Sequence, residues 1–447
     1  MAVCYTTYAS KLDDDKVIDS RFYDPLKIKY LDKLKKNSTC SIQDEFNEIT
    51  ILSSNKENVS FPAILYDLPD SLGNLFNDGQ RINSFSDIGS TKKTSIGGDF
   101  AISRLRHYLK EFGVLPANDH KYLLSTEYVV LRREKKTPPE LLLPYFLLDE
   151  TQYILEKSQR GSNHPRLANK DILNLPLPKL LIQQSGQIQI LIKAAIEKYD
   201  LSKKLYPEAE QELLQRMCLD KVNTKHVLDY SITSKDVFGN ERSDPEFYQP
   251  KFKKLIKHLK TVRSLELDSF CPMPNRGVQP SYDENGDILV INSRHLGTTE
   301  VDIQNAEKTT TSFYNKVNTG KARLRQFDVL MYSTGAYIGR TNTYLENQKG
   351  IASNHVTIIR PDKSVCNPIY LSLFLNSAAG LMQTDQRATG STQREICPQN
   401  QVGKADLKWQ EKLANKVIQA YEAKKEAKQK LQKAKELIET KIKKLLN

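Results

Sequence analysis

The chain has 447 residues, more than a single hydrophobic core comfortably serves, so we expect at least two domains. Hydrophobic residues make up 39% and charged residues 27%, and no apolar run reaches the roughly 18 residues of a membrane helix, so we expect a cytoplasmic protein that does not span a membrane. The 66 lysines and arginines outnumber the 54 aspartates and glutamates, which favours a polyanionic partner such as nucleic acid, although a solvated basic surface would give the same counts.

The start of the chain and its cysteines exclude two further classes. The acidic run Asp13-Asp14-Asp15 precedes any apolar stretch of signal-peptide length, so we expect no export. The six cysteines form no CxxC pair and have no histidine at metal-ligand spacing. We therefore expect no metal site and no disulfide framework.

An internal repeat begins with Phe22-Tyr23-Asp24-Pro25 and begins again, 225 residues later, with Phe247-Tyr248-Gln249-Pro250. Each copy stands beside an arginine and an aspartate, and each continues into a lysine-rich stretch with apolar residues at helical spacing. We expect both halves to begin with the same amphipathic helix.

Two apolar runs recur next, and both predict buried strands. Residues 99–102 match 328–331, and residues 125–132 match 353–360. The β-branched residues favour a sheet, and a proline follows each copy of the second run. Residues 139–162 then align without a gap onto 368–391, at an offset of 229, and predict one amphipathic helix with a glycine-bearing loop in each copy.

Each copy closes with a heptad seam, in which apolar or small residues alternate in steps of four and three. The first seam is formed by Ile188, Ile192, Ala195, Tyr199, Ser202, Tyr206, Ala209 and Leu213. The second follows 225 residues later, with one lysine, at Leu413, Val417, Ala420, Lys424, Ala427, Leu431, Ala434 and Ile438. The identical phase predicts two long helices that pack on each other, the first of them kinked or restarted at Pro207.

The second copy is four residues shorter between its glycine loop and its seam. We expect the missing piece to include the counterpart of Pro176-Leu177-Pro178.

No convincing active site is present in the sequence. Asn367-Pro368-Ile369-Tyr370 lacks the second proline of the loop with which amino-methyltransferases grip a flipped base, and it aligns with a helix start. The segment from Gly335 to Thr341 has too short a glycine spacing for a phosphate loop, and Arg340 replaces the lysine. The seven histidines form no HxxxH or HExxH pattern, and no GxSxG elbow occurs. We therefore favour a binding module and expect no catalytic residue and no bound cofactor.

The order of several segments resembles one family. These are residues 332–340 (YSTGAYIGR), 353–356 (SNHV), 368–371 (PIYL) and 389–393 (TGSTQ), with 242–250 opening the second half and 205–211 (LYPEAEQ) in the first seam. The chain is similar in these segments to the specificity subunits of type I restriction-modification systems, and the resemblance covers nearly all of it.

The resemblance implies an α+β fold with two pseudo-twofold related target-recognition domains of mixed β-sheet and short helices, separated by an antiparallel pair of long coiled-coil-like helices. It places the first recognition domain at residues 1–180, the central spacer helix at 181–217, a linker at 218–240, the second domain at 241–402 and the carboxyl-terminal spacer helix at 403–447.

The resemblance also implies a function and partners. Each domain would read half of a bipartite site in double-stranded DNA, and the helices would set the spacer between the halves. Two methyltransferase subunits would bring S-adenosylmethionine and methylate adenines, and restriction/translocase subunits would cut unmodified phage or other foreign DNA. The first half departs from the second by carrying Leu105-Arg106-His107-Tyr108 where the second has Thr334-Gly335-Ala336-Tyr337, so we expect it to read a different half-site.

Base reading needs guanidinium, amide and hydroxyl groups on loops, and both copies supply them. In the first domain the candidates are Lys92, Lys93, Arg104, Arg106, His107, Arg160, Asn163, His164 and Arg166. In the second they are Tyr332, Ser333, Tyr337, Arg340, Thr341, Asn342, Arg387, Thr392, Gln393 and Arg394.

Simpler interpretations compete with these assignments. Gly161 and Gly390 could merely end helices, with nearby cations complementing the helix dipole. The aligned Tyr108 and Tyr337 could pack beneath their loops. Residues 404–447 hold 13 lysines against 6 acids, and this surplus could contact phosphates between half-sites or face a partner subunit.

Two other functions remain open from the sequence. The chain could be a self-sufficient DNA methyltransferase or nuclease with an unrecognised site, or a coiled-coil scaffold without sequence preference. Turnover by the chain alone would indicate the enzyme, and salt-resistant partner binding without DNA preference would indicate the scaffold.

Overall fold

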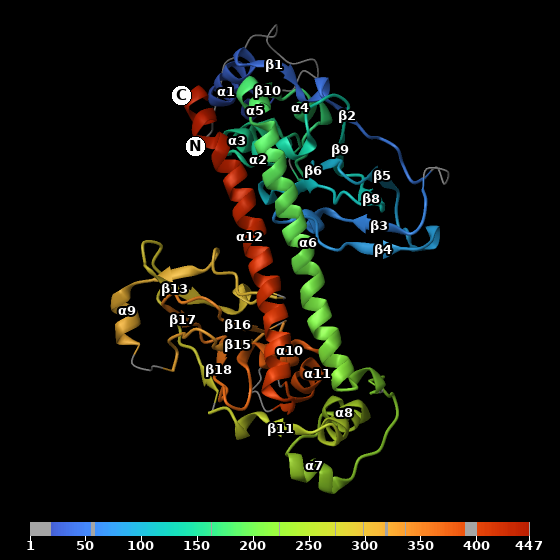
Figure 1. Cartoon of the computed structure of the whole chain (residues 1–447), viewed down its shortest axis with the longest axis vertical. Helices are drawn as coiled ribbons and strands as arrows, with labels where there is room; N and C mark the ends of the chain where they lie inside the picture. Colours follow the sequence, from blue (N-terminus) through green and yellow to red (C-terminus); the bar gives the residue numbers. More distant parts are fainter. Residues whose placement is uncertain are drawn as a thin grey trace. The chain divides into compact units, whose positions relative to one another are not determined.

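The computed structural model describes residues 19–446, apart from 55–58, 162, 223, 273, 298, 318–320, 336 and 389–399. The chain divides into two compact units, and each contains one mixed α/β body and part of both long helices. Unit 1 comprises Met1–Lys203 and Ala423–Asn447, and unit 2 comprises Lys204–Glu422. This is the α+β architecture expected from the sequence, with the long helices α6 (Ser185–Arg216) and α12 (Leu407–Leu446) in the expected places (Figure 1).

Unit 1 holds two four-stranded sheets. The first has the order β2 (Phe46–Glu48), β9 (Tyr128–Arg133), β6 (Phe100–Ser103) and β7 (Phe112–Val114), with all neighbours antiparallel. The second has the order β4 (Gln80–Ile82), β3 (Ala63–Tyr66), β8 (Lys121–Ser125) and β5 (Lys92–Ile96), and only the β3–β8 pair is parallel. A short antiparallel pair joins β1 (Ser38–Ser41) to β10 (Pro176–Pro178).

Unit 2 repeats this arrangement, but within the described residues its second sheet has three strands where that of unit 1 has four. One sheet has the order β12 (Asn275–Arg276), β18 (Val356–Ile359), β15 (Val329–Tyr332) and β16 (Thr341–Thr343). The other has the order β14 (Glu307–Thr309), β13 (Ile288–Ile291) and β17 (Gly350–Ala352), again with one parallel pair, β13–β17. The antiparallel pair of β11 (Ser264–Glu266) and β19 (Gln401–Gly403) corresponds to β1 and β10.

The remaining helices also correspond in the two units, except that α4 and α5 belong to unit 1 and α7 and α9 to unit 2. The bounds in unit 1 are α1 (Pro25–Lys36), α2 (Leu142–Leu147), α3 (Asp149–Ser158), α4 (Asn169–Leu173) and α5 (Lys179–Gln183). Those in unit 2 are α7 (Ser234–Asn240), α8 (Pro250–Thr261), α9 (Thr311–Lys316), α10 (Pro368–Asn376) and α11 (Ala378–Arg387). Helix α7 lies inside the region 218–240 that the sequence assigned to a linker.

The repeat extends to which side chain faces which core, because strand residues alternate between the two faces of a sheet. In unit 1, Phe100 and Ile102 of β6 pack with the helices, while Ala101 packs with the second sheet. In unit 2, Val329 and Met331 of β15 face the helices, while Leu330 faces the other sheet. The strands predicted at 99–102 and 328–331 are confirmed. Within 125–132 and 353–360, a turn precedes the strand proper.

One element predicted as a single helix is two helices in each unit. Helix α2 ends before Leu148, and α10 ends before Ser377, where the backbone is extended. In the first copy Asp149 and Glu150 then occupy the first turn of α3, where carboxylates complement the helix dipole. The spacing alone did not reveal the corner, because α2 and α10 are buried on nearly all sides and have no polar face that marks where they end.

Most positions of both heptad seams are buried, as predicted. In unit 1, Ile188, Ile192 and Ala195 of α6 share a core with Ala427, Leu431, Ala434 and Ile438 of α12. In unit 2, Ala209 and Leu213 share a core with Leu413 and Val417. Ala420 is buried, whereas Tyr199, Tyr206 and the intruding Lys424 are half-buried. Ion pairs flank the seam, Lys198–Glu426 at 2.8 Å in unit 1 and Glu212–Lys412 at 3.2 Å in unit 2.

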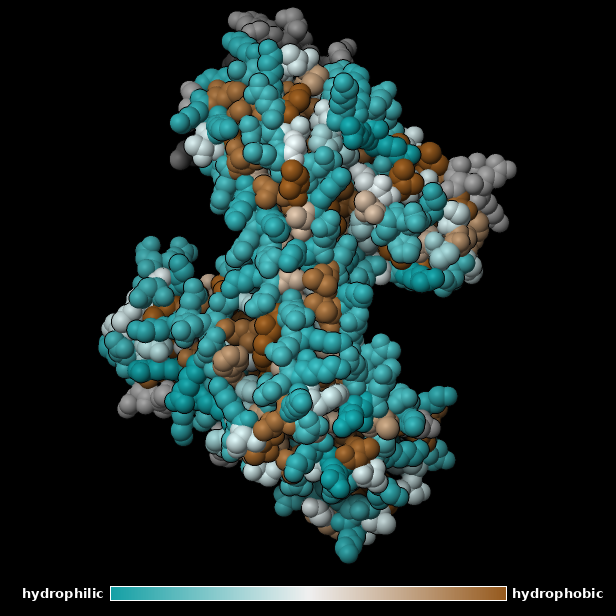
Figure 2. All heavy atoms as spheres, viewed as in Figure 1, coloured by the Kyte–Doolittle hydropathy of each residue, from teal (hydrophilic) through white to brown (hydrophobic). Residues whose placement is uncertain are grey.

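Pro207 lies inside α6, which is a single helix from Ser185 to Arg216, so the proline does not restart it. In unit 1 the beginning of α6 lies beside the end of α12, so these helical segments run antiparallel (Figure 1). None of the helices within the described residues is long and apolar enough to cross a bilayer. The surface drawn in Figure 2 is mostly hydrophilic.

The four-residue deletion in the second copy is not where we expected it. Strand β19 pairs with β11 in the register in which β10 pairs with β1, so Gln401-Val402-Gly403 is the counterpart of Pro176-Leu177-Pro178. The hydrogen bonds Ile42 N to Leu175 O and Leu267 N to Asn400 O also correspond. Because the offset is 225 from this strand to the seam and 229 up to residue 391, the four residues are missing between positions 391 and 401 of the sequence. The junction between the α/β body and the long helix is therefore the same in both units.

Candidate nucleic-acid interface

In unit 1 the first candidate loop connects β6 to β7. Arg106 and Lys110 both have positive φ angles, +46° and +53°, and they bracket a short 3-10 turn, His107–Leu109. Non-glycine residues adopt this conformation at a cost of about 1 kcal/mol or more, and such strain is concentrated at functional sites. Arg106, Tyr108 and Leu109 are exposed. The loop thus presents a cation and an aromatic ring to solvent from a fixed frame.

The second candidate loop follows α3 and is closed by its own backbone. Arg160 N donates to Arg166 O and Arg166 N donates to Arg160 O, both at 2.9 Å, and Gly161 has a φ of +94°. Helix α3 ends earlier, at Ser158, so Gly161 serves this turn and not the helix end. Asn163, His164 and Arg166 are exposed at the tip. The Arg160 guanidinium turns back to Asp171, at 3.2 Å.

The structure brings these two loops together. Leu105 and Arg166 form a β-bridge, Leu167 N donates to Arg104 O at 3.0 Å, and His107 Nδ1 is 2.6 Å from Gln159 Nε2. Two sequence clusters more than 50 residues apart are therefore one surface, from which Arg106, Asn163, His164 and Arg166 face solvent.

A charged network lies beneath this surface. Glu127, in the β8–β9 turn, pairs with Arg104 at 3.1 Å and with Arg166 at 2.9 Å. Arg104 also donates to Asn169 Oδ1, and Asn169 donates to Glu48. Burial works to raise the pKa of Glu127, but the two guanidinium groups outweigh it and hold that pKa below its ordinary value. The stabilisation that these pairs give is present above that ordinary value and is lost as the pH falls through the depressed pKa.

Lys92 and Lys93 lie on strand β5 and are buried, although we expected them at the DNA. Lys92 Nζ is 3.0 Å from Asp67, and Lys93 Nζ donates to Tyr128 O at 2.7 Å. Burial lowers the pKa of Lys93, and it likewise lowers the pKa of His107. In this structure the ammonium groups of both lysines pair with groups of unit 1 itself.

In unit 2 the corresponding loop connects β15 to β16. Tyr337 is exposed, and the Arg340 guanidinium lies over its ring, 4.4 Å from the centroid. Tyr332 meets Tyr337 edge-to-face at 6.3 Å. Gly335 has a φ of +124°, a conformation that side-chain-bearing residues rarely adopt. The loop therefore presents an arginine–tyrosine pair where unit 1 presents Arg106 and Tyr108.

Corresponding backbone hydrogen bonds hold the two loops. Ser103 N donates to Glu111 O at 2.9 Å in unit 1, and Tyr332 N donates to Arg340 O at 2.8 Å in unit 2. Arg104 N donates to Glu127 O at 3.0 Å, and Ser333 N donates to His355 O at 3.1 Å. The frame is the same in both units while the side chains on it differ.

Three predicted contacts of unit 2 point inward. Ser333, Thr341 and Asn342 are buried, and the Ser333 and Thr341 hydroxyls donate to the backbone of His355 and Gly339. They support the loop and do not reach its surface. Arg387 ends α11, where burial lowers its pKa. Thr392, Gln393 and Arg394 lie outside the described residues.

Sequence reasoning missed Glu127 and its counterpart His355, which lie under the loops. Both fall in runs that the repeat had identified only as strands, and their role depends on partners more than 20 residues away. The sequence signal for Glu127 and His355 is the group of polar residues that directly precedes the apolar runs beginning at Tyr128 and Val356.

Removing the charge of Glu127 should strengthen non-specific DNA binding. In Glu127→Gln, two guanidinium groups lose the attraction of the carboxylate, which is about 1 kcal/mol for two unit charges about 4 Å apart in water. We therefore expect roughly fivefold tighter binding to a random duplex. We also expect the salt slope of the binding constant to be steeper by about one. Fluorescence anisotropy over a salt series measures both. Glu134→Gln removes the same charge from an exposed position in unit 1 and serves as the control. Equal effects of the two substitutions would show that only net charge matters.

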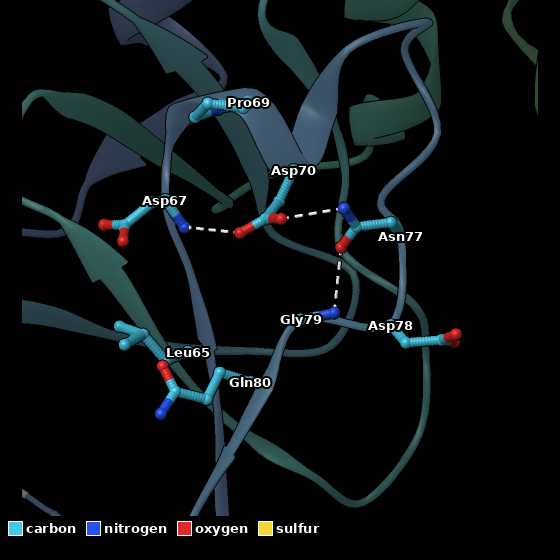
Figure 3. A pocket seen from close by; sticks show the side chains of 8 residues that line it. All are labelled: Leu65, Asp67, Pro69, Asp70, Asn77, Asp78, Gly79 and Gln80. Atoms are coloured by element: carbon cyan, nitrogen blue, oxygen red, sulfur yellow. Dashed lines mark hydrogen bonds between the residues drawn. The ribbon is translucent and has the colours of Figure 1, made fainter. Parts of the chain in front are cut away.

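A pocket of about 570 Å³ lies elsewhere in unit 1, beside the β3–β4 connection (Figure 3). Asp67, Asp70 and Asp78 line it, and Asp70 accepts from Asp67 N and from Asn77 Nδ2, both at 2.7 Å. Its acidic lining is unsuited to phosphate. In the part of the chain that the structure describes, no group of three or more His, Cys, Asp or Glu residues could hold a metal ion.

No protein-family model matches the chain, and no curated protein is similar to it. Solved structures do match. One is a chain of a type I R-M system from work on complex assembly and conformational transition, with 17% identity, covering 93% of this chain and 96% of that one, at a TM-score of 0.29. Another is the HsdS subunit from Thermoanaerobacter tengcongensis, with 16% identity, coverage of 93% and 95%, and a TM-score of 0.27. A third is the type I restriction-modification S subunit from M. genitalium, with 10% identity, coverage of 91% and 95%, and a TM-score of 0.43. Each of these matches thus spans more than nine tenths of both chains, and two of the three are S subunits of type I restriction-modification systems.

Proposed function

We propose that the chain is the DNA-specificity subunit of a type I restriction-modification complex, in which each unit reads one half of a split duplex site. The observation that carries the proposal is the pair of β-hairpin loops, held by matching hydrogen bonds yet different in side chains. A shared frame with divergent loops is what two different half-sites require. The chain acts without a catalytic site of its own.

The exposed groups of unit 1 have the chemistry of base and phosphate recognition. Arginine pairs with the major-groove edge of guanine, asparagine pairs with adenine, and either arginine or histidine can contact phosphate. Arg106, Asn163, His164 and Arg166 form that surface. In unit 2, Tyr337 and Arg340 form it, and we expect Thr392, Gln393 and Arg394 to complete it.

The long helices α6 and α12 connect unit 1 to unit 2. In each unit α6 and α12 pack along a buried seam flanked by ion pairs. We propose that this helix pair sets the spacer and that two methyltransferase subunits, carrying S-adenosylmethionine, dock in its neighbourhood. Restriction subunits would join the same complex.

Substituting one loop should change only one half of the recognised site. For Arg106→Ala in the full chain, co-expressed with its adenine methyltransferase, we expect discrimination at one base pair to fall by roughly 1–3 kcal/mol, about 5- to 150-fold. Genome-wide mapping of methylated adenines would show one relaxed position in one half and an unchanged other half.

Arg81→Ala removes the same charge from the exposed edge strand β4 and should leave the motif intact. If Arg106→Ala relaxed the sequence requirement in both halves of the DNA site, the proposal that each unit reads its own half would be contradicted. Adenine methylation by the purified chain alone with S-adenosylmethionine would instead show a self-sufficient enzyme.

A further inference from the structure

Tyr108 and Tyr337 occupy the same position in the two loops. The two tyrosines are 229 residues apart in the sequence, and so are the ends of the strands that precede them. The hydrogen bonds that close the two hairpins correspond at the same offset. The rest of the loop has diverged, since Arg106 and His107 in unit 1 align with Gly335 and Ala336 in unit 2. A tyrosine is thus retained where its neighbours are not.

Neither tyrosine packs beneath its loop. Tyr108 is 65% exposed and Tyr337 is 60% exposed. Among the large exposed hydrophobic side chains of the described residues, the only other aromatic ones are Tyr282 at 53% and Phe238 at 80%. Tyr108 touches His107 edge-to-face at 6.0 Å, and Tyr337 has its ring against Arg340. Neither ring is buried in the core of its unit, so core packing does not explain why a tyrosine occurs at both positions.

We infer that Tyr108 and Tyr337 are matched DNA contacts that do not read sequence, an inference that rests on the proposed function. A phenol suits this role because its ring packs against a deoxyribose while its hydroxyl donates to a phosphate oxygen. Such contacts fix the register of a protein on the duplex and carry no base information. An identical residue in two loops that read different half-sites must contact what the half-sites share, and that is the sugar-phosphate backbone.

The cations beside the rings fit the same placement. Arg106 is exposed next to Tyr108, and the Arg340 guanidinium stacks on Tyr337. An arginine beside a phosphate-bound phenol adds a charge-assisted contact to the same strand or reaches a base edge next to it.

The test compares full-length Tyr108→Ala, Tyr337→Ala and Tyr282→Ala in fluorescence anisotropy, on a duplex carrying the split site identified by methylation mapping and on a random duplex. We expect each loop substitution to weaken binding to both duplexes by about tenfold, the worth of a hydrogen bond to a charged group. Because tyrosine is uncharged, the salt slope should not change. Tyr282→Ala should stay within about twofold, and the methylated motif should keep its sequence.

The phenylalanine variants separate the ring from the hydroxyl. Tyr108→Phe and Tyr337→Phe should lose part of the affinity that alanine loses, with thermal unfolding unchanged because the rings are exposed. Unchanged binding in both alanine variants, or a change of methylated sequence, would overturn the inference. Failure of the wild-type chain to prefer any split site would instead overturn the proposed function, so the two failures are distinguishable.

Discussion

Asp328→Ala is expected to destabilise unit 2 by roughly 3 kcal/mol, the lower end of what breaking a buried ion pair costs. The Asp328 carboxylate is buried and accepts from Arg360 Nε at 2.7 Å and from Arg360 Nη2 at 2.8 Å. It also accepts from Arg325 N at 2.8 Å. Removing it takes one carboxylate from a half-buried guanidinium and the side-chain cap from the Arg325 turn.

Unit 1 contains the same pair, and the repeat makes the comparison a matched one. Asp99 accepts from Arg132 Nε at 2.9 Å and from Arg132 Nη2 at 2.7 Å, and Ser95 and Ile96 fill the remaining positions. In both units the pair ties the start of one strand to the end of its neighbour, at the end of the strand opposite the candidate loop. We therefore expect Asp99→Ala to destabilise unit 1 by a similar amount.

The measurement can tell the units apart because the only tryptophan, Trp409, lies in unit 2, where it packs against Tyr370. Denaturant unfolding followed by tryptophan fluorescence should shift for Asp328→Ala, while Asp99→Ala should shift mainly the circular dichroism transition. Asp268→Ala removes the same charge from an exposed turn and should change the free energy of unfolding by less than about 0.5 kcal/mol. Coincident fluorescence curves for Asp328→Ala and Asp268→Ala would refute the role of this pair.

Much of the fold could be predicted from the sequence, because the repeat and the hydrophobic periodicities are local signals. The apolar runs around Phe100 and Val329 are buried strands, and the seams ending at Leu213 and Ile438 are buried. The corners at Leu148 and Ser377 were missed because nearly every residue of α2 and α10 is buried, so no polar face marks where these helices end. The four-residue deletion was misplaced because the counterpart of Pro176-Leu177-Pro178 is recognised only by its strand pairing. The strand with which this segment pairs is more than 100 residues away in the sequence.

The structure brings candidate residues together by loop, but it does not place all of them at the surface. The sequence identified the two segments of unit 1 that meet through Leu105 and Arg166, yet it could not show which side chains turn inward. Ser333 and Thr341 satisfy backbone groups, and Lys93 satisfies Tyr128 O. Those partners are fixed by tertiary packing. Polar residue type therefore indicates a candidate loop, but which of its side chains face inward is seen only in the structure.

Ile192→Ala is expected to destabilise unit 1 by about 2–5 kcal/mol, the usual cost of emptying a buried isoleucine site. Ile192 is fully buried in the core that α6 and α12 share with the helices of unit 1. Ile190, two residues earlier on the same helix, is 70% exposed. Ile190→Ala deletes the same atoms from the solvent side, and we expect it to change stability by less than about 0.5 kcal/mol.

Scanning calorimetry of the two alanine variants gives the decisive comparison, since each kcal/mol shifts the midpoint by about 2–4 °C in a unit of this size. If the seam holds α12 against α6, Ile192→Ala should also weaken methyltransferase-dependent adenine methylation at the growth temperature, and Ile190→Ala should not. Equal midpoints for the two variants would mean that the seam is not the contact that fixes the helix pair, and the spacer role proposed for it would then lose its physical basis.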